Sequence, residues 1–210
     1  MSSALAIASV TAMLKHLLGN ALISQAAAAS LGDVTITALP PDRIPTGAEE
    51  RTQLNLYLYR LTPDSGLRHG SMFTSQLTSQ KEQQDTLPLA LDLHYLLTAY
   101  GEREMQAEAL LGYAIQYLYE TPLLTQKVMR SALASLSSGK GSNAALTAQL
   151  ASALTDQVEQ IRMSAEFLSL EEMSKLWSSL QTRSRLSVTY RVSMVLIENR
   201  SAATAVTASP

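Results

Sequence analysis

The stretch Leu87-Pro-Leu-Ala-Leu-Asp-Leu-His-Tyr-Leu-Leu-Thr-Ala-Tyr-Gly101 decides the fold of this chain. Leucine recurs at alternate positions, which is the period of an extended strand whose side chains point to opposite faces. We therefore predict one long strand here, at the centre of a sheet. Asp92 and His94 share a face, with Cα atoms about 6.6 Å apart by strand rise. They are either half of a catalytic site or polar residues on the less buried face of a structural strand.

Four other segments also read as strands. They are Asp33–Leu39, Thr52–Thr62, Val158–Met163 and Arg185–Glu198. In the second of these, Leu54, Leu56 and Leu58 share one face. The last is predicted to alternate over its full length and would span about 45 Å at the usual rise per residue.

Ala4–Ala29 has the helical spacing of an amphipathic helix, with Ile7, Val10, Leu14 and Leu17 on one side. A secretory signal is the alternative, but such a signal places its positive charge ahead of the apolar run, and here Lys15 lies inside it. We predict a long N-terminal helix that packs on the domain or on a partner.

Three further helices have recognisable start signals. Glu102, Glu104 and Glu108 suit the N-terminus of a helix that follows Gly101. Thr121 is predicted to cap the next helix, with Pro122 at its first position. Ser169-Leu-Glu-Glu172 matches a capping box, and the helix that it opens has Trp177 in its apolar stripe.

Together these elements predict an α+β fold: a single domain with a mixed, mostly antiparallel sheet, helices packed mainly on one face, and a long N-terminal helix. We place the domain at residues 1–199 and expect a disordered tail at 200–210, where the residues are small and polar. The long polar loop Pro63–Thr86 is of the length that is usually functional or mobile.

Composition excludes several kinds of function. The chain of 210 residues contains no cysteine, which removes disulfides, thiol nucleophiles and thiolate metal sites. Its formal charge of −2 gives no electrostatic footprint for nucleic acid, and no Lys/Arg cluster suits a membrane surface. The three histidines are scattered, and Gly139-Lys-Gly141 lacks the spacing of a phosphate loop. We expect no metal and no cofactor.

Catalysis by Asp92 and His94 would need a nucleophile on a sharp turn with an oxyanion hole behind it. The chain has no Gly-x-Ser-x-Gly elbow and no cysteine. We therefore expect a structural role for the pair and no enzymatic activity.

Six segments together resemble one protein family. They are Leu54–Arg60, Leu87–Gly101, Ala109–Gly112 with Thr121–Leu123, Val158–Ile161, Leu168–Glu172 with Ser174–Trp177, and Arg185–Val188. In consistent order they resemble the tail-terminator or cap proteins of extracellular contractile injection systems, the phage-tail-like particles typified by the antifeeding prophage and virulence-cassette particles.

The resemblance implies a structural protein that forms a ring, expected to be hexameric, on the last layer of the inner tube. Such a ring stops tube growth and joins the sheath to that end, so the implied partners are further copies of the chain, the tube protein and the sheath protein. It also implies assembly in the bacterial cytoplasm and then a place in a released extracellular particle. Within the Pro63–Thr86 loop, we expect Arg68, Met72 and Phe73 to contact a neighbour or the tube.

Two other functions stay open at this point. One is an assembly adaptor or chaperone that the finished particle does not retain. The other is a hydrolase that uses His94.

Overall fold

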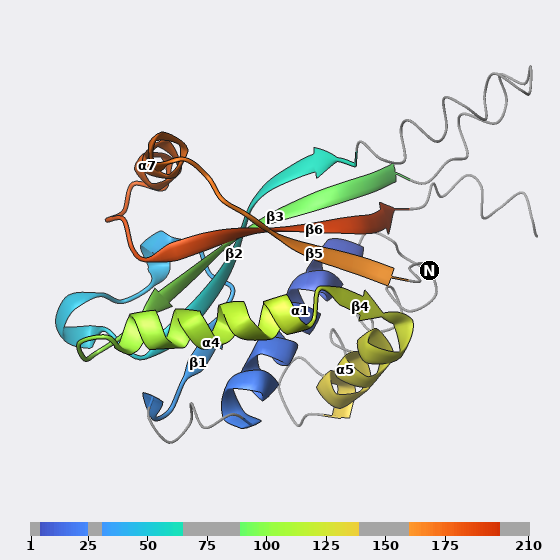
Figure 1. Ribbon diagram of the computed structural model, residues 1–210, viewed down its shortest axis with the longest axis horizontal. Helices are drawn as coiled ribbons and strands as arrows, with labels where there is room; N and C mark the ends of the chain where they lie inside the picture. The colour runs from blue at the N-terminus through green and yellow to red at the C-terminus, as the bar shows by residue number, and fades with distance from the viewer. Residues whose placement is uncertain (1–4, 25–30, 65–88, 139–159, 198–210) are drawn as a thin grey trace, which may run out of the picture.

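The computed structural model describes residues 5–24, 31–64, 89–138 and 160–197 (Figure 1). One sheet of six strands has the order β1-β2-β3-β6-β5-β4. The strands are β1 (Thr35–Thr37), β2 (Gln53–Pro63), β3 (Leu89–Tyr100), β4 (Leu123–Thr125), β5 (Gln160–Glu166) and β6 (Ser187–Ile197). Only β1 and β2 pair in parallel among these strands, and the other four pairings are antiparallel. The predicted mixed, mostly antiparallel sheet is confirmed, and β3 lies at its centre.

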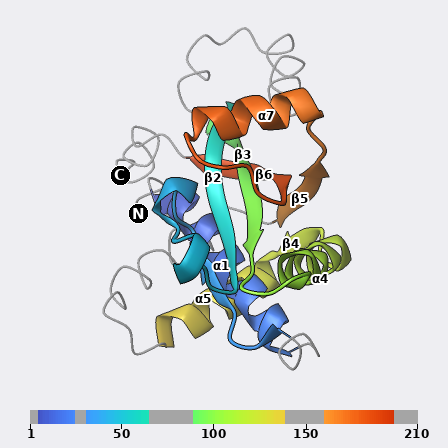
Figure 2. The same ribbon diagram turned by 90° about the vertical axis from the view of Figure 1, so that its left-hand side faces the viewer.

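The helices lie mainly on one face of the sheet. Helices α1 (Ala6–Ser24), α4 (Gln106–Glu120) and α5 (Gln126–Ser138) lie on one side, and α7 (Leu170–Ser179) crosses the other (Figures 1 and 2). Two short 3-10 helices, η2 (Pro41–Arg43) and η3 (Gly47–Glu49), lie between β1 and β2. The predicted α+β class is confirmed.

Helix α1 supplies much of the core beneath the sheet. Of the predicted apolar side, Val10 and Leu14 are buried there and Ile7 and Leu17 are partly buried, while Met13 and Leu18, which were not part of that prediction, are also buried. The Thr11 hydroxyl lies 2.8 Å from the Tyr95 hydroxyl and so ties the helix to β3. Among the described residues, no helix is both long and apolar enough to cross a lipid bilayer.

Strand β3 is buried on both faces. Leu91, Leu93, Tyr95 and Leu97 belong to the main core. Asp92 and His94, on the other face, are also only 6% and 8% exposed. The prediction that this face is less buried was therefore wrong, because Tyr59 and Glu166 lie against His94 on that side.

A β-bulge in β2 changes which residues share a face. Leu58 pairs with Tyr95 but Arg60 pairs with His94, so Tyr59 is the extra residue. Because side chains alternate, one extra residue exchanges the faces of everything after it. Thr62 therefore lies on the same face as Asp92 and His94, opposite to the face of Leu54 and Leu56. A register shift between Leu91 and Leu93 likewise interrupts the pairing of β3 with β6. The uniform alternation predicted over Arg185–Glu198 is not found.

The region around Thr121 differs from the prediction. Leu123–Thr125 form β4, paired with Gln160–Arg162 of β5, and the Met163 N–H donates to the Pro122 carbonyl at 2.8 Å. Thr121 is therefore not the N-cap of a following helix but the C-cap of α4, where its N–H donates to the Tyr117 carbonyl, and α5 begins only at Gln126. Pairing with a strand far along the chain overrode the local N-cap signal.

Two helix starts show what local signals can and cannot predict. Helix α4 begins at Gln106, after Met105 in a left-handed conformation with φ of 62°, so Glu102 and Glu104 precede the helix. Helix α7 begins as predicted: the Ser169 side chain accepts from the Glu172 N–H, and the Glu172 carboxylate accepts from the Ser169 N–H. The capping box is confirmed.

Several predictions fall on residues outside those that the structure describes. These are most of the Pro63–Thr86 loop with Arg68, Met72 and Phe73, the Gly139–Gly141 segment, and the tail at 200–210. They stay predictions.

Candidate functional site

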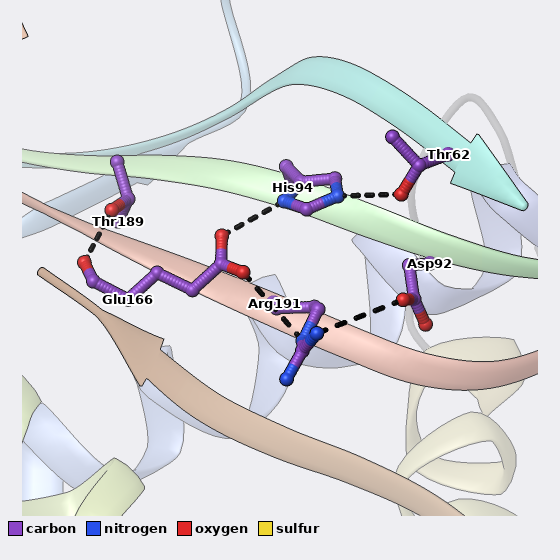
Figure 3. Close-up of polar contacts among 6 residues, drawn as sticks. All are labelled: Thr62, Asp92, His94, Glu166, Thr189 and Arg191. Carbon is purple, nitrogen blue, oxygen red and sulfur yellow. Dashed lines mark hydrogen bonds and ion pairs between the residues drawn. The ribbon is translucent and has the colours of Figure 1, made fainter. Parts of the chain in front are cut away.

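The most concentrated group of polar side chains surrounds His94, on the sheet face that α7 crosses (Figure 3). The Thr62 hydroxyl of β2 lies 2.8 Å from His94 Nε2. Glu166 Oε2, at the end of β5, lies 2.8 Å from His94 Nδ1. Both ring nitrogens of this buried imidazole are therefore partnered, by residues from the strands on either side of the β3–β6 pair.

Arg191 of β6 extends the group toward Asp92. Its Nε lies 3.6 Å from Glu166 Oε1 and its Nη1 lies 4.0 Å from Asp92 Oδ2. Both distances are ion pairs but too long for hydrogen bonds. Within the part of the chain that the structure describes, neither Asp92 Oδ1 nor Arg191 Nε has a hydrogen-bond partner. The Thr189 hydroxyl donates to the main-chain carbonyl of Glu166 and fixes the end of β5. We call these six residues the His94 cluster.

The order hydroxyl, imidazole, carboxylate in Thr62, His94 and Glu166 is also the order of a catalytic triad. In the nucleophile elbow of the α/β-hydrolases, the triad nucleophile stands on a strained turn. Thr62 instead lies within β2, opposite Asp92, and the described residues with positive φ are elsewhere. The His94 cluster therefore has the bonding pattern of a triad without the backbone that presents a nucleophile. Its geometry fits a set of polar contacts that holds the strands β2, β3, β6 and β5 together.

Sequence reasoning singled out Asp92 and His94 but missed their partners. Glu166 is 72 positions from His94 along the chain, and Thr62 reaches the imidazole only because of the bulge at Tyr59. No local pattern marks either residue. Among the described residues, no three of His, Cys, Asp or Glu gather in a way that could hold a metal ion.

A second polar centre lies at the far end of β3, and sequence reasoning missed it. Arg185 binds Glu50 through two hydrogen bonds, of 2.9 and 3.2 Å. The Arg185 guanidinium also lies 5.7 Å from the centre of the Tyr100 ring. Burial raises the pKa of Tyr100 to about 12, although Arg185 acts in the opposite direction.

An open polar hollow of about 990 Å³ lies beside that second centre, lined by Glu49, Glu50, Arg51, Gln53 and Glu102 among others. Gly101 closes the turn next to it, where a Cβ would come within 2.8 Å of the Ala107 nitrogen. Only glycine fits this approach of the turn to α4.

Large apolar side chains are exposed at several places, and two of these places combine more than one such side chain. At the start of α7, Phe167 and Leu170 are 89% and 88% exposed. On the outer side of α4 and β4, Tyr119 is 84% exposed, and Ile115 and Leu123 are 38% and 40% exposed. Side chains of this size on a surface are typical of protein–protein contacts.

A family model describes nearly the whole chain. Residues 9–208 match the Pvc16 N-terminal domain. This chain belongs to that family. No curated protein matches it.

Two solved structures are similar to this family member in fold. One is the sheath/tube terminator of the PVC extracellular contractile injection system in its extended state, with 16% sequence identity and a TM-score of 0.45. The other is the tube-terminating cap of the anti-feeding prophage, with 17% identity and a TM-score of 0.45. The matches cover 85% and 79% of this chain but 56% and 48% of those chains, so it spans about half their length. At this level of similarity the two matches carry no argument about function.

Proposed function

We propose that this chain is a structural cap, or tail terminator, of a contractile injection system. It forms a ring of six copies on the last layer of the inner tube, ends the polymerisation of the tube and joins the sheath to that end. The observation that carries this proposal is the match of residues 9–208 to the Pvc16 N-terminal domain. The residue segments that resemble tail terminators, including all of β3, lie within the same range.

The edges of the sheet suit such an assembly protein. β1 pairs with only the first three residues of β2, and no other described strand pairs with the outer edge of β2 from Leu56 to Pro63. Unpaired edges of this kind can accept a strand from another chain. We propose that an exposed edge pairs with a strand of the sheath.

The proposed partners are further copies of this chain, the tube protein and the sheath protein, with neither nucleic acid nor a membrane. The contacts to a neighbour or to the tube include Arg68, Met72 and Phe73 of the Pro63–Thr86 loop. The protein assembles in the bacterial cytoplasm and then becomes part of an extracellular particle. It performs no catalysis, and the His94 cluster supports the sheet.

Deleting the gene tests the proposal. We expect tubes and sheaths of abnormal length or unstable particles, because tube growth then lacks its stop. Electron microscopy of purified particles measures this directly. Particles of normal length and stability would refute the proposal.

The alternative of an assembly adaptor or chaperone makes a different prediction. A cap must remain in the finished particle at about one ring per particle, whereas an adaptor leaves it. Quantitative mass spectrometry of purified particles separates these two possibilities.

One observation favours a hydrolase enough to test it, namely the alignment of Thr62, His94 and Glu166. If the cluster is catalytic, His94→Ala abolishes turnover of an ester substrate while particles assemble normally. We expect the opposite result: no turnover by the wild-type protein, and impaired assembly in the variant.

A further inference from the structure

Two exposed surfaces on opposite sides of the sheet have complementary character, and neither belongs to the His94 cluster. We propose that neighbouring copies meet head to tail through them, the α7 corner of one copy lying on the α4–β4 ridge of the next. The α7 corner comprises Phe167, Leu170, Glu171 and Glu172. The α4–β4 ridge comprises Gly112, Ile115, Tyr119, Leu123, Lys127 and Arg130. This inference rests on the proposed function, since it specifies the contact that would close the ring.

The α7 corner presents two apolar side chains on a rigid support. Phe167 and Leu170 are almost fully exposed on either side of Ser169, which caps α7. The capping box fixes the path of the backbone at this point, so the positions from which both side chains project are set before any partner arrives. Glu171 and Glu172 make this corner acidic, although Glu171 also pairs with Lys175 at 2.6 Å.

The α4–β4 ridge presents an apolar strip with a basic end. Gly112, Ile115 and Tyr119 follow one another at helical spacing along the outer side of α4, and a Cβ at Gly112 would meet nothing. Leu123 continues the apolar surface into β4, because the alternating Leu124 points into the core. The strip therefore combines three large apolar side chains with a bare stretch of helix, against which a protruding phenylalanine can pack.

The charges next to the ridge are opposite to those of the corner. Lys127 and Arg130 are exposed on α5, directly after β4, and form no ion pair within the described residues. The other end of the ridge has two acidic neighbours, Glu108 one turn before Gly112 and Glu120 beside Tyr119, whose carboxylate accepts a hydrogen bond from Gln116 at 3.0 Å. The acidic corner and the basic end of the ridge therefore attract one another across an interface.

The positions of the two surfaces fit a second copy of this chain. α7 crosses one face of the sheet, α4 lies on the other, and β4 is the edge strand farthest from β1 (Figures 1 and 2). The corner of one molecule therefore cannot reach its own ridge. Two different and mutually complementary surfaces on one chain define a head-to-tail contact, which forms a ring if its rotation closes.

Site-directed cross-linking tests the contact, because the natural chain has no cysteine. We would introduce Leu170→Cys and Tyr119→Cys separately and together, and treat the free protein and purified particles with a short bismaleimide. The double variant should give a ladder of cross-linked multimers that extends beyond the dimer. Single variants should give no cross-linked multimer, since each carries only half of the contact. Dimers from a single variant would indicate a two-fold contact and overturn the proposal. The proposal would also fail if the double variant cross-linked only to tube or sheath protein, or gave no cross-linked product.

A mixing experiment tests the contact independently, without a chemical cross-linker. Phe167→Asp disrupts the apolar contact of the α7 corner, and Tyr119→Asp disrupts that of the α4–β4 ridge. Both side chains are exposed, so each variant should keep the fold. Each variant alone should bind itself at least about tenfold more weakly than the wild type, because it loses a central apolar contact. An equal mixture should give dimers, because one intact corner and one intact ridge remain. A monomeric mixture, or self-association of either variant at the wild-type level, would overturn the proposal.

Failure of this inference and failure of the proposed function have different signatures. If the protein is missing from purified particles, the cap proposal fails whatever the cross-linking of the free protein shows. If the protein is present in particles but the double-cysteine variant gives no ladder, the cap proposal stands and this contact is wrong.

Discussion

His94 combines the contacts of a catalytic histidine with a position inside a paired strand. A buried imidazole needs partners for both ring nitrogens, and the structure supplies a hydroxyl from one neighbouring strand and a carboxylate from another. The same pair of partners would also suit a triad. The backbone at Thr62 favours the structural interpretation, because it is part of a paired strand and not of a turn.

Substitution at Thr62 tests directly whether its hydrogen bond to His94 stabilises the fold. Thr62→Val keeps the shape but leaves His94 Nε2 without its partner, which should cost about 1 to 3 kcal/mol of unfolding free energy. Thr62→Ser keeps the hydroxyl and should cost clearly less. Urea unfolding followed by circular dichroism measures both. A loss in Thr62→Ser with little or none in Thr62→Val would mean that the methyl group matters and the hydrogen bond does not.

The tyrosines on β3 predict how stability depends on alkaline pH. Burial raises the pKa of Tyr100 to about 12 from 10.0 and also raises that of Tyr95. A group whose pKa is higher in the folded state contributes stability that is full below its unfolded pKa. Stability should therefore fall as pH rises from 10 toward 12.

Tyr100→Phe provides the check on that alkaline loss. The phenylalanine cannot ionise, so the fall in unfolding free energy between pH 10 and 12 should be shallower than in the wild type. Urea titrations at fixed pH values measure the slope. An unchanged slope would show that Tyr100 does not contribute to the pH dependence.

At the scale of elements, those with a strong internal pattern were predictable. Alternating leucines in β3 and the capping box of α7 predicted both elements because their signals are local. β4 was missed because three residues form a strand only through β5, more than thirty residues further along the chain. The regular alternation of Leu54, Leu56 and Leu58 gives no sign of the bulge at Tyr59. The face of the sheet on which Thr62 lies could therefore not be predicted. The same limit applies to the site: Glu166 reaches His94 only through the finished sheet.

Helix α7 depends on its capping box, which also supports the exposed corner. Ser169→Ala removes the side-chain acceptor for the Glu172 N–H and should destabilise the helix by about 1 kcal/mol. Amide hydrogen exchange in α7 should then be faster than in the wild type. Ser169→Thr, which retains the hydroxyl, is the matched control. Unchanged exchange in the alanine variant would show that packing of Trp177 alone holds the helix.

The same cap predicts an acid response confined to α7. Hydrogen bonds from Ser169 lower the pKa of Glu172 below 4.5. A lowered pKa contributes stability above the unfolded pKa, and this is lost as pH falls through the folded value. Exchange in α7 should therefore accelerate below about pH 4 relative to the rest of the chain. In Ser169→Ala this acid response should be weaker.

At the scale of the whole molecule, the sheet has two differently built faces. The face over α1, α4 and α5 is an apolar core, whereas the other combines the His94 cluster with the packing of Trp177 under α7. β3 contributes buried side chains to both faces. Loss of either face should therefore disturb the strand on which the other depends, and the sheet should unfold as one unit.

Charge placed in α1 tests that cooperativity. Met13 is fully buried and α1 contacts β1, β2, β6, α4 and α5, so Met13→Asp buries an unpaired carboxylate at the centre of the core. With a total stability of about 5 to 15 kcal/mol for a typical domain, this variant should not accumulate in folded form. Lys15→Asp, on the exposed side of the same helix, should fold normally.

Trp177 is the only tryptophan and lies across the sheet from Met13, so its fluorescence reports on the other face. For the milder Met13→Ala, urea unfolding seen by Trp177 fluorescence should coincide with unfolding seen by circular dichroism. If Trp177 kept its native emission after the helices melted, the two faces would be separate units. Assembly defects from α1 variants would then need an explanation other than loss of the fold.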